Sequence, residues 1–316
     1  MSPGATAASS SAPYRPSSFL LAVSLAAMLA MWSFNYVAGK TALRYFDGLT
    51  LAVFRIEIAA VIFLPIYFFR GNRSKLTRQD LWTLSYLGWL LCANQVFFTV
   101  GLAYTTSGHS SMILAIGPIL VLLLARAMKI EALTAAKIVG MALAFTGAAI
   151  LAAENGFDLR RSPTLSGDLL TLLGTTCFTF YVVLSKKVAS KYDSIEMNAV
   201  NLFASAIVLL PLTIFRGAHF HWGSVPWEGW MGLLYMAAIS SVAAYTLFYW
   251  ALRYMEASRV AAVNYFQPVG AILVAAMFLG EVPTRHLLLG GVLILLGVYL
   301  AERGKASAGK VEALKN

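Results

Sequence analysis

Long apolar runs follow one another along almost the whole chain, with short polar breaks between them. A run of about 20 apolar residues is the length at which an α-helix crosses the hydrocarbon core of a bilayer. The pattern therefore predicts an all-α membrane protein with ten transmembrane helices, at residues 19–39, 49–69, 81–103, 109–128, 132–152, 168–185, 197–215, 229–250, 259–279 and 286–302.

Composition supports a membrane protein and narrows its chemistry. Of the 316 residues, 59% are hydrophobic and 12% are charged, whereas soluble domains carry about 25% charged residues. The two cysteines, Cys92 and Cys177, both fall inside predicted helices, which argues against a disulfide framework and gives no metal-binding spacing. We expect no metal site and no cofactor.

The two ends of the chain lack the long apolar pattern. Residues 1–18 are small, polar and proline-containing, which predicts a disordered cytoplasmic tail. The apolar run after them is longer than the core of about 7 to 15 residues that a cleaved signal peptide has. We therefore expect it to be retained as the first helix, and we expect residues 302–316 to form a second cytoplasmic tail.

Lysine and arginine are distributed unevenly between the two sides of the predicted bundle. With the amino terminus inside, 17 of these residues fall on the cytoplasmic side, six fall outside and Arg55 lies within the membrane. The positive-inside rule therefore places both termini in the cytoplasm. Basic loops at an anionic leaflet account for the net charge of +10, so we expect a lipid bilayer and no nucleic acid as partner.

An internal repeat relates the two halves of the chain. Residues 103–120 align with residues 253–270 at a constant offset of 150. Under this offset the shared residues are Tyr104 with Tyr254, Pro118 with Pro268, Glu131 with Glu281, Thr134 with Thr284, Gly140 with Gly290, and Gly147 with Gly297. The preceding helices align at an offset of 146, where residues 63–71 (FLPIYFFRG) match residues 209–217 (LLPLTIFRG).

The repeat predicts how the two halves lie in the membrane. Each half holds five helices, and because five is odd the second half enters the membrane with the opposite orientation. Inverted repeats of this kind place a substrate site near the bilayer midplane and allow alternating access. The fold class is therefore predicted as two inverted five-helix repeats, which favours a carrier over a channel.

Several motifs resemble the ten-helix drug/metabolite transporters of the EamA type. They are WSFNYVAGK (32–40), the FR pair at Phe54 and Arg55, GDLLTLLGTTCFTFYVVLSKK (167–187), YWALRYMEASRVA (249–261) and LGEVPTRHLLLGGVLILLGVYLAER (279–303). The resemblance implies two five-helix domains, at residues 19–152 and 168–301. It also implies a multi-pass carrier of the cell inner membrane, often an exporter of amino acids or similar small metabolites. In the first half, KIEALT (129–134) departs from the Gly-Glu pair usual in the family.

Polar and aromatic residues near the middle of the runs are candidates for the substrate site. Trp32 and Asn35 lie one turn apart on the first helix, and Asn264 and Gln267 lie one turn apart on the ninth. Interhelical hydrogen bonds and the interfacial aromatic belt are the structural alternatives. The predicted substrate-binding set is Trp32, Asn35, Arg55, Asn94, Gln95, Tyr181, Asn201, Tyr245, Asn264 and Gln267.

Arg55 and Glu57 stand near the middle of the second apolar run. Each charge costs about 2.5 to 3.5 kcal/mol at mid-membrane on insertion scales, so each needs a wet or paired environment. Two residues apart on a helix, they point about 200° from each other and cannot pair. Arg55 aligns with Asn201, which predicts an inward-facing position; Glu57 is either the proton-coupling candidate or a partner for a neighbouring helix.

Other repeated residues are predicted to have structural roles. Glu131 and Glu281 stand at the predicted starts of helices five and ten, where a carboxylate caps free amides and meets the positive end of the helix dipole. Pro118 and Pro268 are predicted to kink helices four and nine in their middle, where the kinks either shape a cavity or are packing kinks of the kind membrane helices tolerate. Close helix packing is predicted at Gly140, Gly147, Gly290 and Gly297.

Three classes of function compete on these observations. A membrane enzyme should show a convergent set of acids, histidines or a nucleophile with its base, and this chain has four scattered histidines. A channel or receptor would not require paired inverted halves. We therefore predict a secondary transporter and not an enzyme, with a small-molecule substrate and no nucleotide motif. A homodimer is left open, and the alternative is a channel, receptor or enzymatic role.

Overall fold

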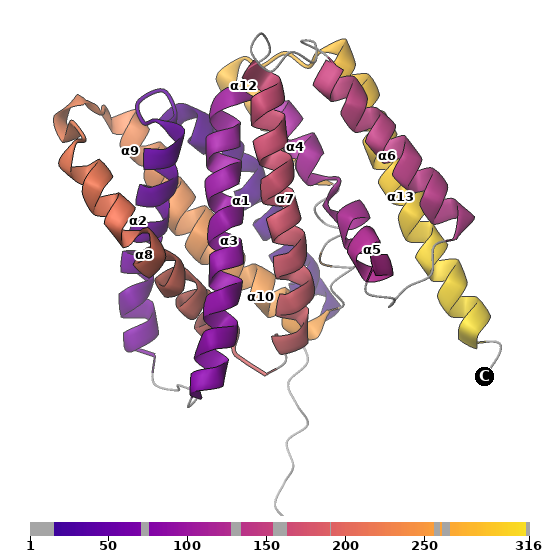
Figure 1. The fold of residues 1–316 in the computed structure, drawn as a ribbon, viewed down its shortest axis with the longest axis horizontal. Helices are drawn as coiled ribbons and strands as arrows, with labels where there is room; N and C mark the ends of the chain where they lie inside the picture. The colour runs from indigo at the N-terminus through magenta and orange to yellow at the C-terminus, as the bar shows by residue number, and fades with distance from the viewer. Residues whose placement is uncertain are drawn as a thin grey trace, which may run out of the picture.

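The computed structural model describes residues 16–70, 76–127, 134–153, 163–189, 191–255, 260 and 266–313 (Figure 1). Within these ranges the chain forms helices and no strand. Six stretches are long and apolar enough to cross a membrane: α1 (Ser18–Ala42), α2 (Gly48–Phe68), α3 (Arg78–Tyr104), α7 (Pro163–Val188), α8 (Ser194–Ala218) and the continuous stretch Trp227–Tyr254. Shorter apolar helices occupy Ser107–Leu120, Ala135–Leu151, Gln267–Leu279 and Arg285–Leu300.

These segments match the ten predicted runs one for one, and the prediction of an all-α membrane fold is confirmed. The remaining helices are α4 (Ser107–Leu114), α5 (Gly117–Ala127), α6 (Ala135–Ala153), α9 (Trp227–Leu234), α10 (Tyr245–Tyr254), α12 (Gln267–Leu279) and α13 (Arg285–Ala313). A short 3-10 helix, η1, covers Trp222–Ser224. Helix α13 continues through most of the predicted carboxy-terminal tail, whereas residues 1–15 lie outside the described part of the chain.

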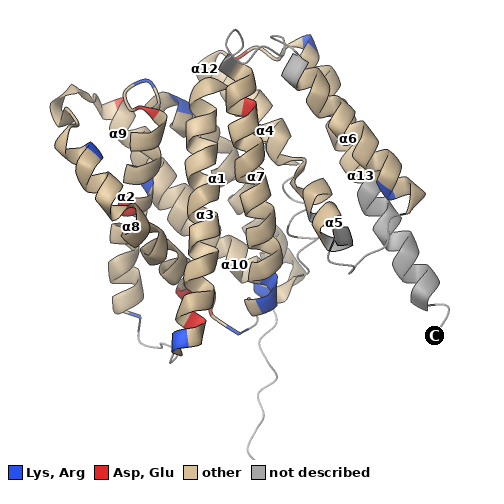
Figure 2. Ribbon diagram, in the orientation of Figure 1, with Lys and Arg blue, Asp and Glu red and all other residues tan. Residues whose placement is uncertain are grey.

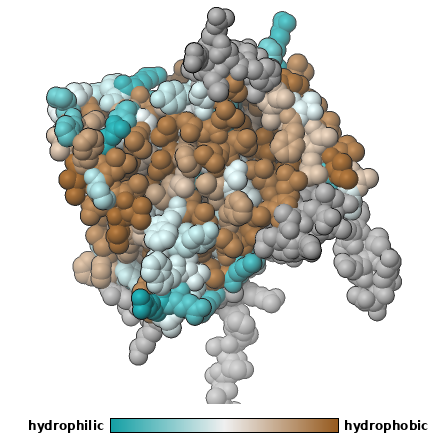
Figure 3. Space-filling model, viewed as in Figure 1, coloured by the Kyte–Doolittle hydropathy of each residue, from teal (hydrophilic) through white to brown (hydrophobic). Residues whose placement is uncertain are grey.

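The distribution of charge follows the expected membrane arrangement. Most charged residues gather at the two ends of the helices, and the middle of the bundle is almost free of them (Figure 2). The surface between these ends is an apolar band on the face that Figure 3 shows. The band satisfies the requirement that a lipid-facing surface be apolar, because no water is present there to solvate polar groups.

Polar breaks between the runs act as helix caps. Asp47 begins α2, where its carboxylate accepts hydrogen bonds from the amides of Leu49 at 3.1 Å and Thr50 at 3.0 Å. Thr77 and Asp80 form a capping box at the start of α3. Such caps satisfy the backbone donors that the first turn of a helix leaves unpaired, so the local sequence determines where each span starts.

Contacts between helices follow the two-fold relation of the inverted repeat. Helix α2 packs against α8, and α6 against α13, which pairs each helix with its counterpart in the other half. Helix α3 packs against α7, and the related stretch Trp227–Tyr254 packs against α1. The two halves therefore share one extended interface along the bundle.

Two ion pairs obey the same relation. Asp47 at the start of α2 pairs with Arg216 at the end of α8 at 3.4 Å, and Asp193 at the start of α8 pairs with Arg70 beyond the end of α2. Burial alone would raise the pKa of Asp47, but hydrogen bonds with Thr50, the charge of Arg216 and the Leu49 amide hold it below its usual range. Each pair thus joins the two halves at one end of the bundle.

Glycines bring α6 and α13 into backbone contact at one edge of the molecule (Figure 1). A Cβ atom on Gly147 would lie 2.4 Å from the carbonyl oxygen of Gly290, and one on Gly297 would lie 2.4 Å from that of Gly140. Only a residue without a side chain allows this approach. The prediction of close packing at these four glycines is confirmed.

The fourth predicted helix is broken, and this corrects the sequence prediction of a single span. Helix α4 ends at Leu114 and α5 begins at Gly117, so that Pro118 lies in the first turn of a new helix. Pro268 likewise occupies the first turn of α12. Proline fits a first turn because the amide it lacks has no partner there, so both prolines begin helices and neither kinks the middle of one.

Helix α9 is joined to α10 by a π-helix, η2 (Tyr235–Ala244). The stretch Trp227–Tyr254 has 28 residues, whereas its first-half counterpart α3 has 27. A π-helix has a wider turn than an α-helix and accommodates an extra residue. The second half therefore contains a local widening that the first half lacks.

Candidate functional site

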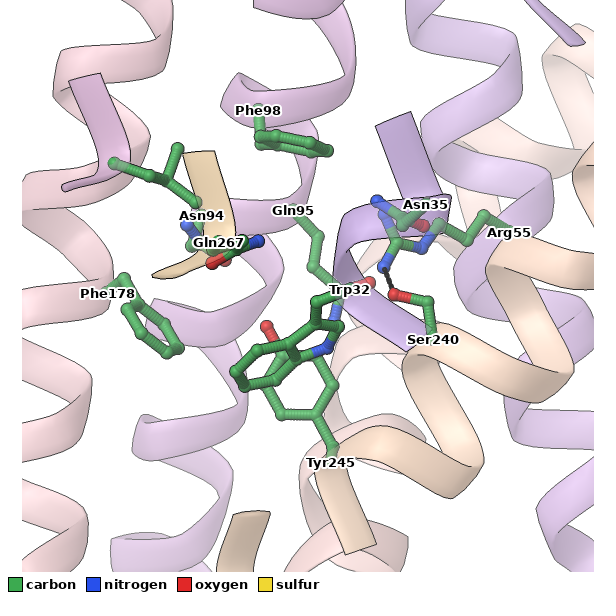
Figure 4. A pocket seen from close by; sticks show the side chains of 11 residues that line it. Trp32, Asn35, Arg55, Asn94, Gln95, Phe98, Phe178, Ser240, Tyr245 and Gln267 are labelled. Carbon is green, nitrogen blue, oxygen red and sulfur yellow. Dashed lines mark hydrogen bonds between the residues drawn. The ribbon is translucent and has the colours of Figure 1, made fainter. Parts of the chain in front are cut away.

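A cavity of about 560 Å³ lies between the two halves. Helices α1, α2, α3 and α4 of the first half and α7, η2, α10 and α12 of the second half all contribute to it (Figure 4). Its lining residues are Trp32, Asn35, Arg55, Asn94, Gln95, Phe98, Leu114, Phe178, Ser240, Tyr245 and Gln267.

Seven of the ten residues predicted for the substrate site line this cavity. They are Trp32, Asn35, Arg55, Asn94, Gln95, Tyr245 and Gln267. The predicted set included neither Ser240 nor Phe178, which also line the cavity. The break in the fourth span and the start of α12 help to form the cavity, since Leu114 ends α4 and Gln267 begins α12.

Arg55 is the charged group of the cavity, and its side chain is nearly inaccessible, with the residue 3% exposed. Its Nε donates to Ser241 Oγ at 2.9 Å and its Nη2 donates to Ser240 Oγ at 3.3 Å. Its buried Nη1 has no hydrogen-bond partner. No described acidic side chain lies within ion-pair distance of it, so its charge is solvated only by hydroxyl groups.

The π-helix supplies both of those hydroxyl groups. Ser241 also donates toward Gln95 Oε1 at 3.2 Å, which connects Arg55 to α3 through one hydroxyl. Asn198 of α8 donates to the Ser241 carbonyl at 3.3 Å and to the Val242 carbonyl at 3.0 Å. The wider helix thus presents two adjacent serines to the arginine while Asn198 binds two of its backbone carbonyls.

Amide and aromatic side chains complete the lining. Asn94 Nδ2 donates to the Gly174 carbonyl at 3.0 Å, which fixes the amide between α3 and α7. The buried Oδ1 of Asn35 accepts no hydrogen bond. Trp32 lies edge-on to Tyr245 at 5.2 Å and to Phe178 at 6.4 Å between ring centroids. One wall is therefore aromatic, and two fully buried polar atoms of the lining, Arg55 Nη1 and Asn35 Oδ1, have no hydrogen-bond partner.

Two predicted site residues contact each other instead of the cavity. The hydroxyl groups of Tyr181 and Tyr249 are hydrogen-bonded, and Asn201 donates to them at 3.2 and 2.6 Å respectively. This cluster joins α7, α8 and α10. Asn264, also predicted for the site, lies outside the described residues.

Glu57 does not line the cavity. Its Oε1 accepts a hydrogen bond from Thr213 of α8 at 2.8 Å, and the residue is half-buried. This contact corresponds to the second of its two predicted alternatives, a partner on a neighbouring helix.

Glu281 caps a different helix from the predicted one. Its carboxylate accepts hydrogen bonds from the Ser107 amide at 3.0 Å and the Ser107 hydroxyl at 3.1 Å, at the start of α4. Helix α13 instead begins after Thr284, which accepts from the Leu287 amide. Free amides at a helix start attract a carboxylate from any nearby segment, and sequence position alone did not identify the segment. Glu131 lies outside the described part of the chain.

Inverted halves of membrane-spanning helices around a central polar cavity define a membrane transporter. The chain belongs to the EamA-like transporter family, whose pattern matches residues 19–153 and again residues 165–302. This confirms the resemblance that the sequence motifs indicated.

Relatives support the same family. An "Uncharacterized transporter" of Archaeoglobus fulgidus is 28% identical over 87% of this chain and 95% of its own length. A "Probable amino-acid metabolite efflux pump" of Salmonella typhimurium is 26% identical over 86% and 91%. A "Probable terminal-alkyne amino-acid exporter" of Streptantibioticus cattleyicolor is 27% identical over 67% and 70%. A solved crystal structure shares the fold with a TM-score of 0.64 and 17% identity, covering 90% of this chain and 97% of the other.

Proposed function

We propose that the protein is a secondary transporter that exports amino acids or closely related zwitterionic solutes across the inner membrane by alternating access. Both termini lie in the cytoplasm in this proposal. The observation that carries it is Arg55, a buried cation that lines the cavity with Nη1 unused and, among the described residues, no acidic partner. A buried charge of this kind requires compensation, and a substrate carboxylate supplies it.

A zwitterion matches the other groups of the cavity as well. Arg55 Nη1 donates to the carboxylate, and Asn35 Oδ1, which has no donor of its own, accepts from the ammonium group. The rings of Trp32, Phe178 and Tyr245 pack against the apolar part of the solute. The names of two relatives, an amino-acid metabolite efflux pump and an amino-acid exporter, support this substrate class.

Counterflow in proteoliposomes tests the proposal. Vesicles loaded with a neutral amino acid are offered the labelled amino acid, the amine that remains when its carboxylate is removed, or the carboxylic acid that lacks the amine. We expect the amino acid to exchange at least about tenfold better than either analogue, since losing one charge-assisted hydrogen bond costs about 1.5 to 3 kcal/mol.

Two results would contradict the proposal. Equal exchange of the amine and the amino acid would show that the protein does not recognise the carboxylate. Absence of exchange for a broad solute panel, together with chemical modification of a solute by the purified protein, would favour an enzyme over a transporter.

A further inference from the structure

A buried histidine and aspartate form a second polar site, apart from the substrate cavity. His109 Nδ1 lies 3.1 Å from Asp168 Oδ2, and their side chains are 4% and 6% exposed. Asp168 Oδ1 accepts a hydrogen bond from Thr105 Oγ1 at 2.5 Å. The two residues are 59 positions apart in the chain, so the sequence alone did not bring them together.

The pair joins the two halves of the transporter. Thr105 and His109 belong to the first half, at the end of α3 and in α4, whereas Asp168 belongs to the second half, in the first turns of α7. Alternating access moves one half against the other. The attraction between His109 and Asp168 therefore helps to hold the two halves together, and a movement of one half against the other changes it.

One proton sets the charge of the pair. With a neutral imidazole and an ionised carboxylate the pair carries one negative charge in a buried place, which is costly. An added proton makes the pair neutral overall, with an imidazolium that donates from Nδ1 to the Asp168 carboxylate. Histidine is the side chain whose charge most readily changes near physiological pH.

Within the described ranges of the chain, these charged or titratable groups lie on the elements packed against α4. Helix α4 packs against α1, α3, α6, α7, α12 and α13. From α7 comes Asp168 itself, and from the segment after α12 comes Glu281, which is bound to Ser107. Lys40 of α1 lines a small cavity together with Glu281. Tyr104 of α3 and both Arg285 and His286 of α13 are exposed. Lys137 lies in the first turn of α6, before Gly140 in the chain.

A second cavity reaches His109 of the pair. His109 lines a space of about 570 Å³ together with Glu281, Thr106 and Thr164. None of the residues that line it belongs to the lining of the substrate cavity. The helix α4 nevertheless connects the two spaces, because His109 lies in its first turn and Leu114, at its end, lines the substrate cavity.

We propose that the His109–Asp168 pair is a proton-binding site whose proton is exchanged for substrate; this rests on the transporter function proposed above. A proton enters from the side opposite the termini, binds the pair and neutralises its charge. It leaves toward the other side when the halves have moved, as substrate passes in the opposite direction. Each transport cycle moves one proton inward for one solute outward.

Proton flux in proteoliposomes provides the test. A trapped pH-sensitive dye reports proton movement when an amino-acid gradient is applied, and counterflow of labelled amino acid is measured in the same preparation. We expect His109→Gln and Asp168→Asn to lose at least about nine tenths of the proton signal while they retain exchange of solute for solute, which needs no net proton movement. The matched controls are His286→Gln, an exposed histidine, and Glu57→Gln, the other coupling candidate; both should keep the proton signal.

A second variant keeps the proposal testable if those two fail to fold. Thr105→Val preserves side-chain shape but removes the hydrogen bond to Asp168 Oδ1. Because that bond stabilises the ionised carboxylate, its loss should shift the pH midpoint of transport upward by about one unit, a tenfold change in proton affinity. A purely structural pair would lower activity at every pH and leave the midpoint unchanged.

The outcomes separate this proposal from the one it rests on. Counterflow without any coupled proton movement in the unaltered protein would overturn the proton site and leave the transporter standing. Loss of the proton signal in Glu57→Gln alone, or an unchanged midpoint in Thr105→Val, would also overturn it. Failure of the unaltered protein to exchange any solute would instead contradict the proposed transport function.

Discussion

Arg55 carries a positive charge inside the membrane and is held there by two serine hydroxyl groups. Hydroxyl groups solvate a guanidinium only in part, because each offers a partial charge and the cation carries a full one. In this respect the site differs from a structural ion pair, in which a carboxylate already neutralises the arginine. A bound carboxylate would gain a charge-assisted hydrogen bond in a place where water competes little.

Replacing Arg55 by glutamine should therefore act selectively on carboxylate-bearing solutes. We expect Arg55→Gln to raise the Kd of an amino acid by about tenfold or more, equivalent to about 1.4 kcal/mol or more, and to change the Kd of the matching amine much less. Isothermal titration of the purified protein in detergent measures both. Glu57→Gln, outside the cavity on the same helix, is the control. Equal weakening of both ligands by Arg55→Gln would assign the arginine a structural role.

The sequence predicted much of the site at the level of residue type. A polar residue in the middle of an apolar run must find a partner, and that argument correctly drew attention to Arg55, Asn94 and Gln267. It did not reveal what the partner would be. Tyr181 and Asn201 meet the same criterion, yet they form hydrogen bonds with each other and with Tyr249 outside the cavity. Ser240 was missed because a serine in a membrane helix also serves as a small packing residue.

At the scale of helices, the repeat predicted the spans well and their interruptions less well. A difference in alignment offset, 146 against 150, indicated extra residues in the second half, and the π-helix accommodates one of them. Hydropathy does not distinguish a π-turn from an α-turn, since the side chains are equally apolar in both. The break between α4 and α5 was hidden for the same reason, although Gly117 and Pro118 stand at the break.

The paired helices α6 and α13 offer a direct test of packing. Gly147→Ala places a Cβ atom where the Gly290 carbonyl oxygen would be 2.4 Å away, so the two helices must separate. We expect a loss of about 1 to 3 kcal/mol in the free energy of unfolding, measured by denaturation in detergent. Gly223→Ala is the matched control, because a Cβ there meets nothing within 4 Å. Equal stability of both variants would mean that α6 and α13 adjust freely.

At the scale of the whole molecule, contacts between the two halves join both ends of the bundle. On the side of the termini, Asp193 pairs with Arg70 and also lies 3.8 Å from Arg253. Asp80 there accepts from Lys191 at 2.6 Å and from Tyr192, and its hydrogen bond raises the pKa of Lys191. On the opposite side the related pair, Asp47 with Arg216, is longer and more exposed. His109 and Thr105 of the first half also contact Asp168 of the second half on this opposite side, so contacts between the halves hold both ends of the bundle.

Breaking one pair at a time should shift access to the cavity in opposite directions. Arg70→Gln weakens the side of the termini and Arg216→Gln the other side, each by about 0.2 to 1 kcal/mol, which changes a two-state population up to about fivefold. The measurement uses Ser240→Cys in a background in which Cys92 and Cys177 are alanine. A membrane-impermeant maleimide is then added to inside-out or right-side-out vesicles. Arg70→Gln should speed labelling from the side of the termini, Arg216→Gln should speed it from the other side, and Arg285→Gln should do neither. The same change in both vesicle orientations would show that the pairs stabilise the fold without selecting between the two open states.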